Sequence, residues 1–340
     1  MTSRQERILG GLFGAAIGDA MGAVTETRPA YLIKEKWGFV DDLIEPPFDT
    51  FAKGQPAGQV TDDFSLAVVT IEEILKNGGI VTDEVAKNAL LRWQKMFRFF
   101  DPYAGPTSKN AIYKLMGLYE DHSRDHLTCE NSTGTNGGAM KAAPIGYLNG
   151  TDYDKTIEDV IIITKPTHNN PLAAAGAAAI ACAAGKAVDD ENATIDDIFE
   201  AGLYGAVNGR KRADEVCKPC AGPSMERRIQ FAIELGLKYS YDFDKAMNAI
   251  ADIIGTGLPA VEAVPAAFGM IAACGGDAVD SVLMGVNAGH DTDTVATMIG
   301  GIVGALHGYE AYSEEHRNKI EKVNGYDLTA LALSIDAAKR

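Results

Sequence analysis

Cysteine is scarce in this chain. The sequence has five cysteines, an odd number, and they are spread over 340 residues. Such a set argues against a disulfide framework and favours a reducing compartment, so we expect a cytoplasmic protein. Cys217 and Cys220 form a C-x-x-C pair without a second such pair or an alternating strand–helix context. We therefore interpret their spacing as coincidence.

Positive charge is also in deficit, because 31 Lys and Arg residues face 47 Asp and Glu residues, which gives a net charge of -16. The resulting field repels polyanions, and we expect no nucleic-acid partner. A small anion can still bind where backbone N–H groups or metal ions supply a local positive potential.

Long apolar runs are missing as well. The Ala-rich stretch from Pro171 to Gly185 is shorter than the roughly 20 apolar residues that span a bilayer, so it predicts a buried helix. Arg4 and Arg7 precede an apolar run in the manner of a secretory signal, but Asp19 and several glycines interrupt that run. We expect neither a membrane span nor a cleaved leader.

What is present favours a helical globule. Apolar residues make up 46% and charged residues 23%, a balance that excludes compositional disorder. The periodic segments are long, rich in Ala and Leu, and lack the alternation of strands, which predicts an all-α fold. Length alone, at roughly 150 residues per domain, would allow two domains. No linker or repeat divides the chain, so we predict one compact domain over residues 1–340.

The first helical segment carries a stripe of glycines at every fourth position, at Gly10, Gly14, Gly18 and Gly22. This spacing lines one face of a helix and allows a second helix to pack very closely. A dinucleotide-binding loop is excluded, because no strand precedes the glycines and their spacing is wrong. Small residues recur in Leu172–Ala184 and Met298–Ala305.

Three other segments predict connections. Trp37–Gly58 is rich in Pro and Gly and indicates a surface loop, and the polar stretch Lys186–Arg228 indicates connections around a short helix. Ser132–Gly138 is a Gly-rich turn ahead of the helix-like Ala139–Ala143. Its amides are suited to phosphate or ribose oxygens, although the Gly-Lys-Ser/Thr core of a Walker A loop is absent.

Two acidic clusters mark predicted helix starts. Thr61-Asp62-Asp63 precedes the apolar run Phe64–Leu75, and Asp291-Thr-Asp-Thr294 precedes Val295–Leu306. Thr and Asp are favoured as helix N-caps, which is the simplest explanation of either cluster alone. Capping needs only one residue, however, and the mutual repulsion of paired carboxylates is relieved by a cation.

If the two helix starts meet, their side chains form a set of oxygen donors without Cys or His, namely Thr61, Asp62, Asp63, Asp291, Asp293 and Thr294. Such a set suits Mg²⁺, with Mn²⁺ as a substitute, better than zinc. The spacing does not match an EF-hand loop. Two neighbouring ions fit four carboxylates better than one ion does.

Several short motifs together resemble the ADP-ribosylglycohydrolase family. They come in family order over about residues 8–308: Gly14–Gly22 with Glu26, Thr61-Asp62-Asp63, Asp101-Pro102, Gly134–Pro144, Pro166-Thr167-His168 and Asp291–Thr294. The family includes enzymes that remove ADP-ribose from Arg or Ser side chains and the enzyme that reactivates nitrogenase reductase. The resemblance implies an all-helical domain with a dinuclear Mg²⁺ site on the six oxygen donors.

The resemblance also implies roles for residues outside the metal set. Glu26 resembles a mobile general base or water-orienting group, and Asp101 resembles an aspartate that contacts the scissile ribose. Pro102 predicts that Asp101 lies in a turn. The implied pocket residues are Ser132, Gly134, Asn136, Gly137, Gly138, Met140 and His168. The chain departs from the family at His290, where such sequences commonly have Gly.

The predicted function is therefore metal-dependent hydrolysis of a ribosyl glycosidic bond. The substrate is either an ADP-ribosylated side chain or small ADP-ribosyl compound, or a nucleoside-like N-riboside without a pyrophosphate. The second version stays open because no dense Arg or Lys set lies beside the Gly-rich turn. A non-catalytic, crystallin-like protein and a two-metal phosphohydrolase are weaker alternatives. The sequence leaves the oligomeric state open.

Overall fold

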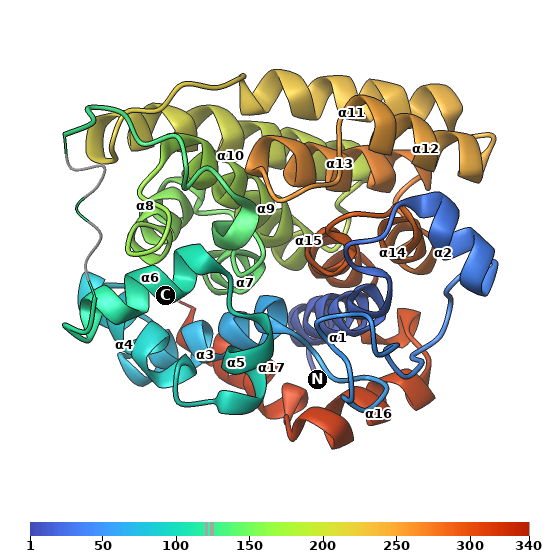
Figure 1. Ribbon diagram of the computed structural model, residues 1–340, viewed down its shortest axis with the longest axis horizontal. Helices are drawn as coiled ribbons and strands as arrows, with labels where there is room; N and C mark the ends of the chain where they lie inside the picture. The colour runs from blue at the N-terminus through green and yellow to red at the C-terminus, as the bar shows by residue number, and fades with distance from the viewer. Residues whose placement is uncertain (120–121, 123–125, 340) are drawn as a thin grey trace.

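A computed structural model describes residues 1–119, 122 and 126–339 of the chain (Figure 1). Over these residues the chain forms 17 α-helices and two 3₁₀ turns, and extended pairing is limited to two isolated bridges. The predicted all-α fold is confirmed.

The helices, in chain order, are α1 (Ser3–Thr25), α2 (Ala30–Trp37), α3 (Asp62–Lys76), α4 (Asp83–Trp93), α5 (Phe97–Tyr103), α6 (Pro106–Leu115), α7 (Ala143–Asn149), α8 (Tyr153–Thr164), α9 (Pro171–Asp189), α10 (Ile195–Val216), α11 (Met225–Tyr239), α12 (Phe243–Ile253), α13 (Ala260–Ala273), α14 (Ala278–Asn287), α15 (Thr292–His307), α16 (Glu314–Asn324) and α17 (Leu328–Ala338). The 3₁₀ turns are η1 (Asn136–Gly138) and η2 (Tyr309–Ala311).

The glycine stripe of α1 packs against α15, as the sequence predicts, and the two helices lie side by side near the middle of the molecule (Figure 1). A Cβ atom added at Gly14 would lie 2.3 Å from the carbonyl oxygen of Gly300, and one at Gly18 would lie 2.4 Å from that of Ala296. At Gly22 the added atom would lie 2.3 Å from the Cα of Asp293. The glycines therefore bring the end of α1 against the start of α15.

The Ala-rich helix α9 forms a second buried axis, which packs against α7, α8, α10 and α15. Both α1 and α9 are long and apolar enough to cross a membrane, yet 100% and 94% of their most apolar windows are buried inside the protein. Their apolar character is thus used in the core, and this agrees with the buried helix predicted from Pro171 onward.

Of three segments that the sequence predicts as connections, one is confirmed and two differ in the structure. Trp37–Gly58 is confirmed as a loop, because α2 ends at Trp37 and α3 begins only at Asp62. The short helix predicted within Lys186–Arg228 is wrong, since α10 alone has 22 residues. Its buried face is mostly Gly and Ala, which give little hydrophobic periodicity. Beyond the Gly-rich turn, the helix α7 begins at Ala143 rather than at Ala139.

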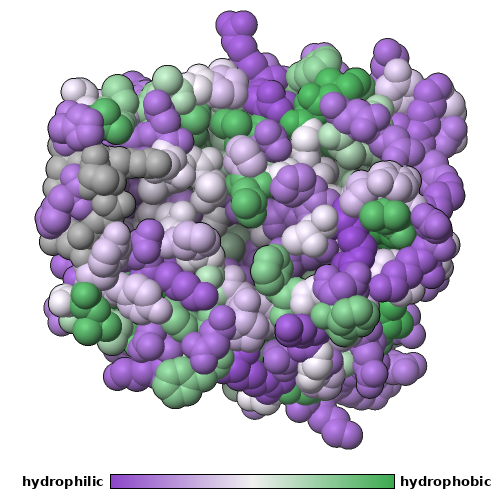
Figure 2. Space-filling view, viewed as in Figure 1, coloured by the Kyte–Doolittle hydropathy of each residue, from purple (hydrophilic) through white to green (hydrophobic). Residues whose placement is uncertain are grey.

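The face of the molecule shown in Figure 2 is mainly polar, with apolar side chains scattered among polar ones. Scattered apolar residues are ordinary on a soluble surface and by themselves mark no site. Buried polar side chains, which are uncommon in a protein interior, are the more informative feature of this molecule.

Candidate metal centre

The start of α3 is held in place by Asp19, a fully buried residue of α1. Its carboxylate accepts the backbone N–H groups of Thr61 at 2.9 and 3.0 Å and of Phe64 at 2.9 Å. Asp19 thereby satisfies N–H groups that a helix start leaves unpaired. Because Asp19 does this work, the carboxylates of Asp62 and Asp63 are not needed as caps.

The start of α15 presents Asp291, Asp293 and Thr294, all of which are buried. Asp291 accepts a hydrogen bond of 2.6 Å from the side-chain amide of Asn136, the first residue of η1. Asp293 accepts the backbone N–H of Thr294 at 3.0 Å. The Gly-rich turn and the second acidic cluster are therefore in direct contact.

Glu26 caps the end of α1 and joins this second cluster. One ligand oxygen from each of Glu26, Asp291 and Asp293 lies within 4.8 Å of the others. The next residue, Thr27, donates its N–H to the carbonyl of His290 at 2.6 Å, and His290 donates to Arg28 at 2.8 Å. Thr27 and His290 both have left-handed φ values, 68° and 69°, which are uncommon for residues with a side chain. The two hydrogen bonds hold the Glu26 segment beside the start of α15 and offset the cost of this backbone strain.

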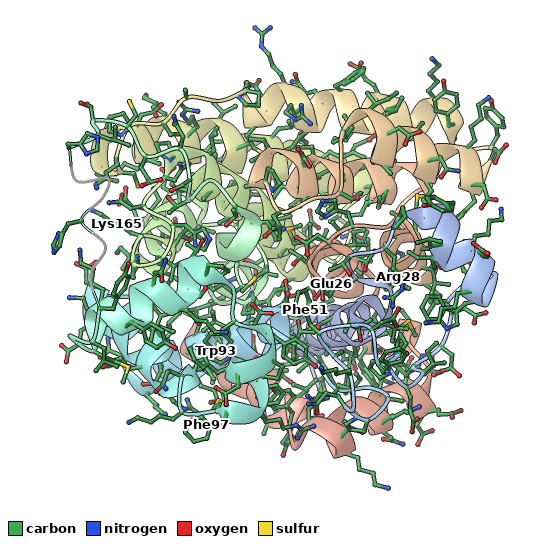
Figure 3. The ribbon with its side chains drawn as sticks, viewed as in Figure 1. Glu26, Arg28, Phe51, Trp93, Phe97 and Lys165 are labelled. Atoms are coloured by element: carbon green, nitrogen blue, oxygen red, sulfur yellow. The ribbon has the colours of Figure 1, made fainter. Side chains whose placement is uncertain are left out.

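The two helix starts and the Gly-rich turn open onto one cavity of about 700 Å³. Glu26 and Phe51, both labelled in Figure 3, line this cavity. Phe51 and Leu258 line the cavity while their side chains are 58% and 56% exposed, so they form apolar parts of its mouth. The acidic lining residues are Glu26, Asp62, Asp63, Asp291 and Asp293.

Burial raises the pKa of every acidic group in this cluster, and for all of them except Asp291 the charge of neighbouring carboxylates raises it further. Burial, followed by the charge of Asp291, raises the pKa of Glu26 to about 8. Burial, followed by the charge of Asp19, raises the pKa of Asp62 to about 8. The pKa values of Asp63 and Asp293 lie well above the usual range of a carboxyl for the same two reasons. Carboxylates gathered in this way hold protons unless a cation compensates their charge.

The residues fit a hard divalent cation. Asp63 Oδ1 is buried without a hydrogen-bond partner among the described residues. An unpartnered buried carboxylate oxygen is costly unless an ion accepts its lone pairs. The same cavity is lined by Asp62, Asp291, Asp293 and Thr294, whose oxygen atoms are ligands that suit Mg²⁺ or Mn²⁺.

His168 also lines the cavity, three residues before the start of α9. Its Nε2 lies 2.8 Å from the Thr135 hydroxyl, and its Nδ1 lies 2.7 Å from the Thr167 hydroxyl. Burial, with a smaller contribution from the charge of Lys141, lowers the pKa of His168 to about 3. The ring is therefore neutral at pH 7, and with Thr135 it offers hydrogen bonds rather than charge to a ligand.

Most of the residues predicted from the sequence line this cavity: Glu26, Asp62, Asp63, Asn136, Gly137, Met140, His168, Asp291, Asp293 and Thr294. Thr61 is buried behind the others, and its hydroxyl donates to Asp63 at 3.2 Å. Gly138 is buried against Thr164, Gly134 is outside the lining, and Ser132 is exposed and bonded to Glu130.

Asp101 is placed differently from the prediction of a turn. It lies inside the seven-residue helix α5, is exposed, and is not among the lining residues, whereas Pro102 and Tyr103 are. A helix this short makes few internal hydrogen bonds, so Pro102 removes only one of them. The carboxylate of Asp101 is thus outside the cavity in this conformation.

Sequence reasoning missed three contributors. Asp19 has its partners 42 and 45 residues away, so local spacing gives no indication of its role. Lys141 is buried near Asp62, and burial lowers its pKa to about 8 against the opposing effect of that aspartate. The first residues of α6, Pro106 to Lys109, also line the cavity. Their helix-start pattern, Gly-Pro-Thr-Ser, was visible in the sequence.

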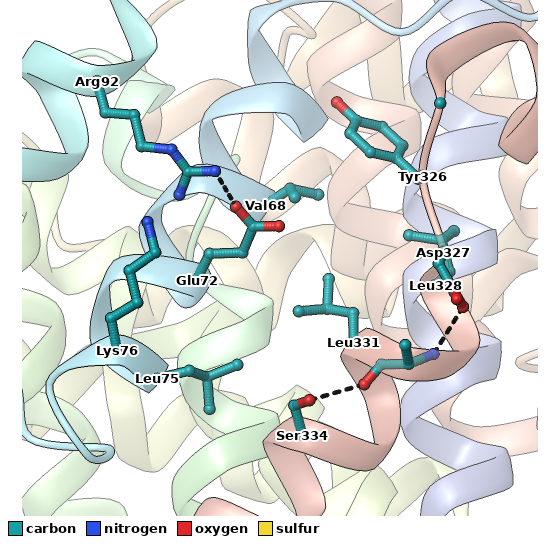
Figure 4. A pocket seen from close by; sticks show the side chains of 12 residues that line it. Val68, Glu72, Leu75, Lys76, Arg92, Tyr326, Asp327, Leu328, Leu331 and Ser334 are labelled. Atoms are coloured by element: carbon teal, nitrogen blue, oxygen red, sulfur yellow. Dashed lines mark hydrogen bonds and ion pairs between the residues drawn. The ribbon is translucent and has the colours of Figure 1, made fainter.

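A second cavity of about 480 Å³ lies between α3 and α17 (Figure 4). Its walls combine Leu75 and Leu331 with an ion pair between Arg92 and Glu72. None of the predicted site residues lines it. The acidic cavity is therefore the candidate site.

The chain matches the family model described as "ADP-ribosylglycohydrolase" over residues 1–340. The chain is 29% identical over 337 residues to the uncharacterized Escherichia coli (strain K12) protein YegU, a match that covers 98% of this chain and 97% of YegU. It is 24% identical over 352 residues to the Bos taurus ADP-ribosylhydrolase ARH3, covering 96% of this chain and 92% of that protein.

Two further similarities come from bacteria and from solved structures. The Pseudomonas putida (strain GB-1) ADP-ribosylarginine hydrolase Tri1 is 24% identical over 321 residues, covering 93% of this chain and 74% of that protein. A solved structure described as an "ADP-ribosylglycohydrolase-related protein complex" superimposes with a TM-score of 0.70 at 22% identity, over 100% of both chains. At this identity the structural likeness shows the fold alone.

Proposed function

The chain belongs to the ADP-ribosylglycohydrolase family, and from this premise we propose that it is a Mg²⁺-dependent hydrolase that releases ADP-ribose from a modified side chain or a small ADP-ribosyl compound. One observation carries the proposal: acidic residues from the end of α1 and the starts of α3 and α15 converge on one cavity. Relatives named as an ADP-ribosylhydrolase and an ADP-ribosylarginine hydrolase support the choice of substrate class.

Asp62, Asp63, Asp291, Asp293 and Thr294 would hold two Mg²⁺ ions, with Thr61 orienting Asp63 from behind. Bound there, Mg²⁺ would supply positive charge that binds ribose hydroxyls and polarises water. The same residues would then lose their shared protons, because a cation reverses the repulsion that raises their pKa values.

Glu26 is the proposed general base. Its carboxylate lies at the cavity wall beside Asp291 and Asp293, where it would take a proton from the water that attacks C1 of the ribose. Positive charge that develops on the ribose ring in the transition state is stabilised by the surrounding carboxylates. The neutral His168 and the amide of Asn136 would orient ribose hydroxyls without competing for the ions.

A phosphate-free N-riboside is the second candidate substrate. The small number of cationic side chains in the cavity lining favours it. Lys109 is the one Lys or Arg among the described residues that line the cavity. A pyrophosphate would therefore depend on Lys109, the start of α6 and the amides of the Gly-rich turn for its neutralisation. The negative net charge of the chain also supports a small or protein-linked riboside as the substrate rather than a nucleic acid. The proposed location of the protein is the cytoplasm.

The test is to incubate the purified chain with ADP-ribosyl-arginine, an ADP-ribosyl-serine peptide and a panel of ribonucleosides, with Mg²⁺ and with EDTA. Mass spectrometry of the products gives the answer. Mg²⁺-dependent release of ADP-ribose is the expected result, and release of free ribose alone would select the second candidate. Silence across the panel, with Mg²⁺ present, would favour a non-catalytic binding role and contradict both.

A further inference from the structure

A third cavity, of about 570 Å³, adjoins the mouth of the acidic cavity. The two cavities share the lining residues Thr27, Phe51 and Pro102, and the other residues of the third cavity belong to the loop between α2 and α3, from Phe48 to Gln55. Among the described residues, none of the Gly-rich turn or of α6 lines it. Because Thr27 directly follows Glu26, the third cavity lies beside the segment of the proposed general base.

The loop that lines this cavity is anchored to the helices and still exposes two aromatic rings. Val40 and the side chain of Asn287 in α14 exchange two hydrogen bonds, each of 2.9 Å. Ala52 is only 1% exposed, whereas Phe48 and Phe51, just before it, are 86% and 58% exposed. Two Phe side chains left in water forgo the stabilisation that burial would give them. Their faces are therefore available to a ligand.

The charged groups at this cavity leave a positive balance. Asp49 is the one acidic residue among the described residues that line it, and its carboxylate pairs with Arg28 at 2.7 Å and with Lys36 at 3.5 Å. Lys53 also lines the cavity, and its ammonium group has no partner among the described residues. Three cations thus face one carboxylate, in a chain whose net charge is -16. The place is suited to a ligand with a negative or electron-rich edge.

These groups match a planar heteroaromatic ring. Phe side chains stack on the faces of nucleobases and other flat heterocycles whatever their substituents. The ammonium of Lys53 and the side-chain amide of Gln55 supply hydrogen-bond donors for the edge of such a ring. The positive charge balance disfavours a cationic guanidinium group. An extended polypeptide finds few free partners here, because the Thr50 hydroxyl already donates to Pro47 at 2.8 Å and Asp49 is paired.

We propose that the third cavity is the leaving-group subsite of the hydrolase, and that the leaving group is a planar heteroaromatic ring with a carbonyl or carboxylate edge. The inference rests on the proposed function, which places C1 of the ribose beside Glu26. It holds whether or not the ribose carries a pyrophosphate, because it concerns only the group bonded to C1.

The subsite acts on the bond that breaks. The water oxygen forms a bond to C1 and its proton passes to Glu26, while the C1–N bond breaks and its electron pair stays on the ring. The ring then takes one proton from solvent. Lys53 stabilises the negative charge that develops on the ring before this protonation, and the two Phe rings hold the leaving group in place.

The first test measures binding of free rings to the full chain in saturating Mg²⁺ by calorimetric titration, and it needs no turnover. The probes are nicotinate, which is a flat ring with a carboxylate, nicotinamide, which is the same ring without the charge, and cyclohexanecarboxylate, which has the charge without a flat ring. We expect saturable nicotinate binding in the millimolar range or tighter. Nicotinamide should bind more weakly, and cyclohexanecarboxylate should bind about 10-fold more weakly or worse, because it cannot stack.

Variants of the shelf residues locate the binding. Phe48→Ala should weaken nicotinate binding by about 5-fold or more, and Phe48 lines the third cavity and not the acidic one. Lys53→Met should remove the preference for nicotinate over nicotinamide. Phe97→Ala, at a 63% exposed ring of α5 outside both cavities, and Lys95→Met, at an exposed residue, are the matched controls and should bind nicotinate like the parent. An unchanged Mg²⁺ titration in each variant shows that the fold is kept.

Kinetics then connect the subsite to turnover. With uridine and nicotinic acid riboside as substrates, Phe48→Ala and Lys53→Met should lower kcat/KM, while release of ADP-ribose from ADP-ribosyl-arginine stays at its parental rate. The inference is overturned by equal binding of the three probes, by parental nicotinate binding in both variants, or by no saturable binding in the parent chain. A loss confined to an ADP-ribosyl-serine peptide would also overturn it, since the cavity would then hold a polypeptide. The expected binding without hydrolysis of any riboside would instead contradict the proposed function and leave the ring-binding site in place.

Discussion

Glu26 differs from the four aspartates of the cluster in where it stands in the chain. The aspartates belong to helix starts, whereas Glu26 caps the end of α1. Thr27 follows it and bonds the carbonyl of His290, and both of these residues have left-handed φ values. Because Glu26 also gathers with Asp291 and Asp293, its proposed role as the general base and a role as a further metal ligand predict different effects of its substitution.

We predict that Glu26→Gln lowers kcat by about 10²- to 10⁴-fold, the range of a lost general base, while Mg²⁺ affinity changes much less. Glu35→Gln on the exposed face of α2 is the matched control and should keep full activity. Steady-state kinetics and Mg²⁺ titration on both variants decide the point. Unchanged kcat in Glu26→Gln would remove Glu26 from the proton-transfer step.

Asp19 shows why a residue can be essential to a site without any local pattern. In the sequence it looks like an interruption of an apolar helix, and its role depends on the two backbone N–H groups, of Thr61 and Phe64, that the fold brings to its carboxylate. The acidic residues of the cavity, by contrast, could be predicted, because Thr61-Asp62-Asp63 and Asp291–Thr294 show their chemistry directly in the sequence. The predicted position of Asp101 in the site was wrong for the opposite reason, since a motif gives the identity of a residue but not the direction of its side chain.

For Asp19→Asn we expect Mg²⁺ affinity to fall by about 10- to 100-fold, as for other partners that orient a metal ligand. The amide places its own N–H₂ against backbone N–H groups, so the free energy of unfolding should also fall by about 1–3 kcal/mol. Calorimetric Mg²⁺ titration and urea unfolding measure the two effects. A variant with parental Mg²⁺ affinity would show that α3 holds its position without this carboxylate.

At the scale of helices, the close approach of α1 and α15 is what joins the two halves of the site. A close approach of some helix to this face was predictable, because the four glycines of α1 are spaced by about one turn. That α15 is this helix was not indicated by the glycines and is known from the structure. The length of α10 was not predictable in the same way, since Gly202, Gly205 and Gly209 on its buried face carry no hydrophobic indication. Close helix packing through small residues can thus be predicted from the sequence when those residues recur at a regular interval, as in α1, and not when they are irregularly spaced, as in α10.

Gly18→Ala tests the α1–α15 contact. The added methyl group would lie 2.4 Å from a backbone oxygen of α15, so the helices must separate, and we expect a loss of about 1–3 kcal/mol in stability together with reduced turnover. Gly134→Ala adds the same methyl group where the nearest atom lies 3.6 Å away, and its stability should stay within about 0.5 kcal/mol. Chemical denaturation of both variants makes the comparison; equal stabilities would show that the helices are not held by this contact.

At the scale of the whole molecule, the acidic cavity sets how stability depends on pH. Burial raises the pKa of Asp19 to about 7 and the pKa values of Glu26 and Asp62 to about 8, whereas the unfolded chain titrates such groups near their ordinary values of about 4. Between these limits the folded chain binds more protons than the unfolded chain. The free energy of unfolding of the metal-free protein therefore falls as pH rises from about 4 to about 8.

In EDTA we expect Tm to fall by about 5–10 °C between pH 5.5 and pH 8.0, and saturating Mg²⁺ at pH 8.0 to restore most of that loss. Mg²⁺ should have little effect at pH 5.5, where protons already compensate the carboxylates. Differential scanning calorimetry at the two pH values gives all four Tm values. A Tm that rises with pH in EDTA would contradict the account of a proton-holding cluster.

The central claim is that the converging carboxylates form a two-ion Mg²⁺ site, and calorimetric titration of the EDTA-stripped chain with Mg²⁺ tests it most directly. The account predicts two Mg²⁺ ions per chain, and binding that is lost or reduced to one weak ion in Asp62→Asn and Asp293→Asn, while Asp196→Asn on the exposed start of α10 titrates like the parent. Absence of saturable Mg²⁺ binding in the parent chain, or parental binding in both cavity variants, would contradict it.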